Sequence, residues 1–151
     1  MKIIVLAGGL STERDVSLSS AAGICRTLVE KGHDAFLLDV FMGLENAPEN
    51  LEDVFTLPDH GLEIVKNIST EEPAPEAVKA SRPDQSDCFF GPNVIELCRL
   101  ADITFLGLHG GEGENGKLQA SFDLLGIKYT GPDSLGCAVA MHKGVAKQIF
   151  L

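Results

Sequence analysis

The sequence predicts an α/β domain with a doubly wound, mostly parallel sheet, of the Rossmann-like type. Two observations indicate this fold. Short apolar runs alternate with longer segments whose apolar residues recur at helical spacing. Glycines follow the first and the third apolar run, where the chain must turn tightly from a strand into a helix. One long irregular segment interrupts this alternation.

The first strand, helix and second strand lie at the start of the chain. Residues Ile3–Leu6 are wholly apolar, as expected for a strand in a sheet that is covered on both faces. A helix is expected from about Ser17 to Lys31, where apolar residues fall on one stripe. Asp15 or Ser17 is expected to cap its start, and Gly32 suits its end. Residues 35–38 form the next strand, parallel to the first because the crossover must be right-handed.

The alternation returns near Asn93. The expected elements are, in order, a helix over 94–100, a strand over 103–106, a helix over 117–125 that ends at Gly126, a short strand over 127–130 and a helix from Ser134. The apolar segment 138–151 is expected to be a helix that is still running where the sequence stops. This lack of a stop signal predicts an N-terminal piece of a longer protein.

The irregular segment extends over about 41–92. Its residues 41–90 hold five prolines and many acids, including the tract Ser69–Glu76. We expect an insertion with weak local structure, in which Leu62–Val65 forms an edge strand or hairpin arm and the rest is poorly ordered. A solvated acidic loop is the simplest interpretation, and a lid or a partner contact is the alternative.

The composition limits the classes of partner. Twelve basic against 22 acidic residues give a net charge of −10, which argues against sequence-independent binding to nucleic acid or anionic membranes. No apolar run approaches the roughly 20 residues that span a bilayer, and the first residues lack a secretory signal. Four widely spaced cysteines are expected to be buried or incidental thiols in a reducing cytosol. We therefore expect a cytoplasmic protein.

Two loops at predicted strand ends carry the candidate chemistry. His109 begins a stretch with four glycines in eight residues, at the end of a strand where open parallel sheets bind ligands. Glu13 lies in the loop after the first strand, where a carboxylate can bind an ammonium group or orient an imidazole. These positions predict that Glu13 and His109 converge on one small polar ligand.

Other motifs give weaker or negative signals. The loop after the first strand lacks both the dinucleotide and the P-loop spacing. The histidines and acids form no metal cluster, so no metal site is expected. Lys143 and Lys147 share a helix face that could meet phosphates or be merely solvated. Arg14 is expected to pair with Asp15 or another surface acid.

Four segments together resemble the signatures of D-alanine–D-alanine ligases. They are 8–18, 108–116 with Gln119, 126–131 and 138–143. The resemblance covers both ends of the chain and skips the insertion. The family usually has Asp at the positions of Asn115 and His142, and the second departure puts the setting of Lys143 in question.

The resemblance implies an ATP-grasp ligase whose pre-ATP-grasp domain binds the first D-alanine. Such enzymes use ATP and Mg²⁺ to activate the carboxylate of one D-alanine, which the amine of a second then attacks, for peptidoglycan precursor synthesis. The implied roles are catalytic for Glu13, substrate-binding for His109, Val16, Ser17 and Gly110, and nucleotide-binding for Lys143. A homodimer is also implied.

The implied domain organisation is a substrate-binding domain over 1–137 and a hinge helix over 138–151 that leads to an ATP-grasp domain beyond the sequence. The chain alone is therefore expected to be inactive. The second substrate, D-alanine, D-lactate or D-serine, stays open. A non-catalytic flavodoxin-like binding module and another kind of ATP-grasp enzyme are the alternatives.

Overall fold

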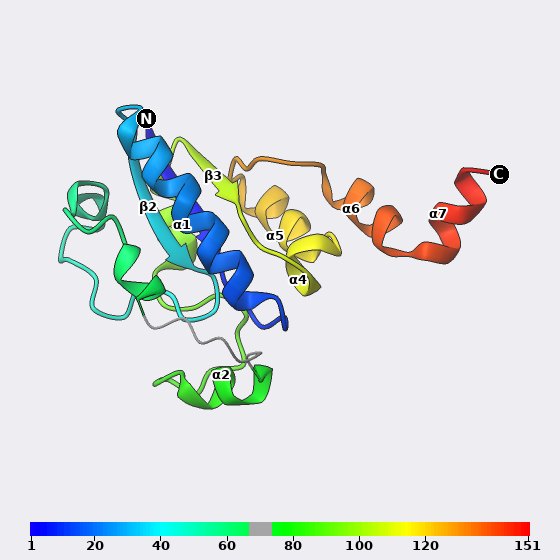
Figure 1. The fold of residues 1–151 in the computed structure, drawn as a ribbon, viewed down its shortest axis with the longest axis horizontal. Helices are drawn as coiled ribbons and strands as arrows, with labels where there is room; N and C mark the ends of the chain where they lie inside the picture. Colours follow the sequence, from blue (N-terminus) through cyan, green and yellow to red (C-terminus); the bar gives the residue numbers. More distant parts are fainter. Residues whose placement is uncertain (67–73) are drawn as a thin grey trace.

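A computed structural model describes residues 1–66 and 74–151. In these residues the sheet has three parallel strands, in the order β2 (Asp34–Asp39), β1 (Lys2–Ala7) and β3 (Ile103–Leu106) (Figure 1). Ile4 pairs with Phe36 on one side and with Thr104 on the other. The predicted parallel α/β fold is confirmed, with β1 as the central strand.

Helices cover both faces of this sheet, as a doubly wound fold requires. Alternate residues of β1 point to opposite faces, because side chains alternate along a strand. Ile3 and Val5 pack against α1 (Arg14–Glu30), whereas Ile4 and Leu6 pack on the side that holds α3 (Val94–Leu100) and α5 (Lys117–Leu125). The predicted bounds of α3, α5 and β3 are confirmed.

The start of α1 differs from the prediction. The helix begins at Arg14 with Glu13 as its N-cap, and the amide of Ser17 already donates to the Glu13 carbonyl at 2.9 Å. Neither Asp15 nor Ser17 is the cap. The predicted end is confirmed, because Gly32 follows the C-cap with a φ of +82°.

The predicted fourth strand over 127–130 is wrong. Tyr129 makes only an isolated parallel bridge to Thr104, although the Thr104 backbone exchanges two hydrogen bonds with Lys128 and Thr130, the residues on either side of Tyr129. The ladder stops there because the next amide of β3, that of Leu106, donates to the Thr130 hydroxyl at 3.1 Å instead of a carbonyl.

The C-terminal segment forms two helices instead of one continuous helix. They are α6 (Ser134–Met141) and α7 (Lys143–Ile149), separated at His142. His142 has a ψ of 85°, which is not helical, and its Nδ1 accepts the Val145 amide at 3.2 Å. The helix is therefore interrupted at His142, because this residue caps a second helix.

The insertion is better packed than the sequence predicts. Its described parts form two 3₁₀ helices, η1 (Leu51–Thr56) and η2 (Leu62–Val65), and the helix α2 (Pro75–Ser81). Val54 and Phe55 are buried in the same core cluster as the sheet, which explains why η1 is ordered. The predicted strand over Leu62–Val65 is wrong, because this segment is η2. Most of the acidic tract lies outside the described residues.

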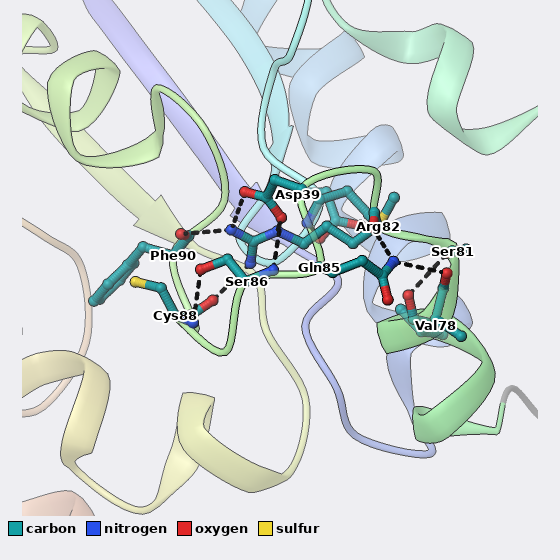
Figure 2. A network of polar contacts seen from close by, with 11 residues as sticks. Asp39, Val78, Ser81, Arg82, Gln85, Ser86, Cys88 and Phe90 are labelled. Atoms are coloured by element: carbon teal, nitrogen blue, oxygen red, sulfur yellow. Dashed lines mark hydrogen bonds and ion pairs between the residues drawn. The ribbon is translucent and has the colours of Figure 1, made fainter.

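Arg82 holds the second half of the insertion together (Figure 2). Only 2% of its surface is exposed, and its guanidinium donates to the carbonyls of Cys88 at 2.6 Å and Phe90 at 3.4 Å. The same group forms an ion pair with Asp84, to which Nη2 donates a hydrogen bond at 3.0 Å, and lies 4.8 Å from the centroid of the Phe41 ring. The hydrogen bond from Arg82 lowers the pKa of Asp84. A buried charge with this many partners fixes the loop around it.

Candidate functional site

The carboxyl ends of β1 and β3 bring the two predicted loops together. The Ser11 hydroxyl, in the loop after β1, donates to the His109 carbonyl at 2.6 Å. Glu13 also reaches the second loop, because its Oε2 lies 2.7 Å from the position that a Cβ on Gly110 would take. The structure therefore places Glu13 directly against the loop of His109.

Gly110 has no room for a side chain. Its φ of +67° and ψ of 179° lie in a region that is essentially restricted to glycine. In addition to its close contact with Glu13, an added Cβ would lie 3.3 Å from the Ser11 Cβ. The exposed residue Glu13 can therefore place its carboxylate at this point of the loop only because residue 110 is a glycine.

Ser17 ties the two strand ends together. Its buried hydroxyl accepts the Gly8 amide at 3.0 Å and donates to the Gly107 carbonyl at 2.8 Å. The only proton of this hydroxyl is therefore used within the protein. Val16, one residue earlier on α1, is 61% exposed, so its side chain is open to a ligand.

An ion pair between Arg14 and Asp39 supports the turn after β1. Asp39 is 3% exposed and also accepts the amides of Phe41 at 2.9 Å and Met42 at 3.0 Å. Arg14 additionally donates to the Gly9 carbonyl at 2.8 Å. The predicted pairing of Arg14 with a surface acid is wrong, because its partner is buried at the end of β2. The position of Asp39 at a strand end was the signal available in the sequence.

His109 meets α1 through Ser20. The Ser20 hydroxyl lies 3.1 Å from Nε2 of the imidazole. Sequence reasoning did not identify Ser20. Its spacing of four residues from Val16 could have done so, because such residues share a helix face.

A family model described as the N-terminus of D-ala D-ala ligases matches residues 2–132. The chain belongs to this family. The matched residues include both loops that carry Glu13 and His109.

Relatives in this family match the whole chain. D-alanine–D-alanine ligase from Lacticaseibacillus casei (strain BL23) is 46% identical over 151 residues, which cover 100% of this chain and 42% of the relative. The enzyme of the same name from Pediococcus pentosaceus is 48% identical over 156 residues, with 100% and 43% covered. The chain therefore spans less than half of the length of these relatives.

Solved structures show the same fold. The D-alanine–D-alanine ligase from Bacillus anthracis complexed with ATP aligns with a TM-score of 0.59 at 21% identity, over 99% of this chain and 35% of that one. The ligase from Coxiella burnetii aligns with a TM-score of 0.58 at 24% identity, over 99% and 41%.

The two departures from the usual ligase pattern keep local hydrogen bonds. Asn115 ends the short helix α4 (Gly111–Glu114), and its Oδ1 accepts the Lys117 amide at 3.0 Å. Asn115 therefore acts as a competent turn-forming residue at this position. His142 caps α7 through Nδ1, a role that an aspartate side chain also fills in proteins.

Clefts adjoin the glycine-rich segment after β3, residues 109–116. A shallow hollow is lined by residues of both loops, including Gly9, His109 and Gly110. A larger cleft of about 720 Å³ lies between the loops and the insertion. Leu10, Phe89 and Glu112 line both. The insertion thus forms a wall next to the site instead of a remote loop.

Lys143 lies apart from the other predicted site residues. It is exposed at the start of α7, which extends away from the sheet at the C-terminal end of the chain (Figure 1). The structure therefore brings together Glu13, His109, Gly110 and Ser17, but not Lys143.

The four thiols of the domain are free, and burial makes most of them unreactive. Cys25, Cys98 and Cys137 are buried, whereas Cys88 is exposed. Burial raises the pKa of Cys25 to about 11 and that of Cys98 to about 12. Among the described residues, no group of three or more histidine, cysteine and acidic side chains could hold a metal ion. No helix in that part of the chain could cross a membrane.

Proposed function

We propose that this chain is the part of a D-alanine–D-alanine ligase that binds the first D-alanine. The observation that carries the proposal is the position of the Glu13 carboxylate, whose Oε2 lies 2.7 Å from where a Cβ on Gly110, the residue that follows His109, would be. Membership of the family and the names of its relatives support the same assignment.

The proposed site suits a small zwitterion. Glu13 binds the ammonium group of D-alanine, and the imidazole of His109 contacts the same substrate. Val16 and Gly110 are proposed to contact the substrate, and Ser17 holds the two strand ends that carry these groups. A charged hydrogen-bond partner in such a site contributes about 1.5–3 kcal/mol, which corresponds to about 10- to 150-fold in affinity.

The proposal assigns most of the remaining chemistry to residues beyond this chain. Residues 1–137 form the substrate domain, and 138–151 connect it to an ATP-grasp domain. ATP supplies the phosphoryl group that activates the D-alanine carboxylate, and Lys143 contacts the nucleotide. The described residues offer no ligand set for Mg²⁺, so we derive no step through the metal. A cytoplasmic homodimer that acts in peptidoglycan precursor synthesis belongs to the same proposal.

Titration calorimetry with D-alanine tests the site. Glu13→Gln removes the charge and keeps the shape, so affinity should fall by at least about 10-fold. Asp15→Asn, two residues along in the first turn of α1, is the matched control and should leave affinity unchanged. Equal affinity in the wild type and Glu13→Gln would favour a binding module of another kind.

Turnover by the isolated chain tests the division of labour. The chain with D-alanine, ATP and Mg²⁺ should form no dipeptide, because the proposal places the catalytic groups for phosphoryl transfer elsewhere. ATP-dependent dipeptide formation by these 151 residues alone would contradict it.

A further inference from the structure

The hydroxyl of Ser20, a residue of α1, contacts both the backbone of this helix and the imidazole of His109. Its Oγ is 2.9 Å from the Val16 carbonyl, 3.1 Å from the Ser17 carbonyl and 3.1 Å from Nε2 of His109. A hydroxyl has one proton to donate and two lone pairs that accept. The two carbonyls can only accept, and a serine within a helix commonly donates to the carbonyl four residues earlier.

We propose that Ser20 is a positioning residue that holds His109 in the tautomer with its proton on Nε2. With the hydroxyl proton directed at the helix carbonyls, the oxygen lone pair faces Nε2 and requires an N–H there. The other nitrogen, Nδ1, is then the basic atom of the ring. In the described part of the chain, Nδ1 of His109 has no hydrogen-bond partner.

Two serines together fix His109 on both sides. Ser11 holds the backbone by donating to the His109 carbonyl at 2.6 Å, and Ser20 holds the ring. The functional consequence rests on the proposed function: a bare Nδ1 accepts a hydrogen bond from the ammonium group of D-alanine, which it shares with Glu13. The tautomer itself does not depend on the identity of the ligand.

Two other histidines provide internal references for this tautomer. Nδ1 of His60 lies 3.2 Å from the Ala35 carbonyl, which only accepts, so His60 must have its proton on Nδ1. Nδ1 of His142 accepts the Val145 amide, so His142 in its neutral form has its proton on Nε2. One spectrum of the chain therefore contains an example of each tautomer.

The experiment measures the ring-nitrogen chemical shifts of ¹⁵N-labelled chain at a pH where the imidazoles are neutral. His109 should match His142 and differ from His60. In Ser20→Ala, the ratio of the Nε2–H to the Nδ1–H tautomer of His109 should fall by about two- to ten-fold, the size that one net hydrogen bond gives. Ser20→Thr, which keeps the hydroxyl, should restore the ratio. Ser19→Ala, on the exposed neighbour, should not change it.

A His109 spectrum that matches His60 in the wild type would overturn the proposal, and so would an unchanged ratio in Ser20→Ala. D-alanine titrations separate this result from the proposed function. If the tautomer shifts as expected but the wild type does not bind D-alanine, the proposed function fails and the role of Ser20 stands. If the wild type binds D-alanine but the tautomer of His109 does not change in Ser20→Ala, the role of Ser20 fails and the proposed function stands.

Discussion

Gly110→Ala tests the contact on which the site depends. An added Cβ would lie 2.7 Å from Glu13 Oε2, whereas ordinary van der Waals contact begins at 3.4 Å, so the carboxylate must move by about 0.7 Å. An alanine held at the φ of +67° and ψ of 179° of Gly110 would also carry backbone strain of about 1–3 kcal/mol. Because a weakened hydrogen bond to a charged group costs about 1.5 kcal/mol or more, we expect D-alanine affinity to fall by at least about ten-fold.

Gly126→Ala is the matched control for this change. Gly126 has the same φ of +67° but no neighbour within 4 Å of an added Cβ. It should lose about 1–2 kcal/mol of unfolding free energy and keep its affinity for D-alanine. Denaturant unfolding and calorimetry on both variants measure the two quantities. Wild-type affinity in a folded Gly110→Ala variant would refute the reasoning about Glu13.

Two further predictions concern the insertion and the thiols. Arg82→Ala should lower the free energy of unfolding by about 2–4 kcal/mol, because it deletes a buried guanidinium together with its hydrogen bonds. Asp84→Asn, at the exposed partner, should change this free energy little. Equal effects of the two substitutions in denaturant unfolding would contradict the central role of Arg82. A thiol reagent at neutral pH should modify the exposed Cys88 rapidly. Cys25 and Cys98 should remain unmodified, because both thiols are buried and protonated. Modification of Cys98 in the native chain at the rate of Cys88, measured by mass spectrometry, would contradict this prediction.

Local patterns were enough to predict the parts of the fold with strong periodicity. The helix over 117–125 and its cap at Gly126 follow from apolar spacing and one glycine, and both are confirmed. The strand over 103–106 follows from a buried apolar run. These elements depend on neighbours within one or two turns of chain, so their signals are present in short windows of sequence.

The insertion could not be predicted in this way because its order comes from distant contacts. Phe55 packs in the core of the sheet, and Arg82 lies over the ring of Phe41, which is far away in sequence. The many prolines and acids hide these contacts from a local reading. The pairing of Arg14 with Asp39 was missed for the same reason, since it joins α1 to the end of another strand.

The candidate site was predictable in outline because α1 organises it from one face. Glu13, Ser17 and Ser20 are spaced by four and three residues, so they lie along one side of the helix start. Each meets a different part of the segment after β3: Ser17 donates to the Gly107 carbonyl, Ser20 contacts the His109 ring and Glu13 lies against Gly110. A shift of α1 along its axis would disturb all three contacts at once. The helix therefore sets the geometry of the His109 loop, and Glu13 is placed by the same element that places the imidazole.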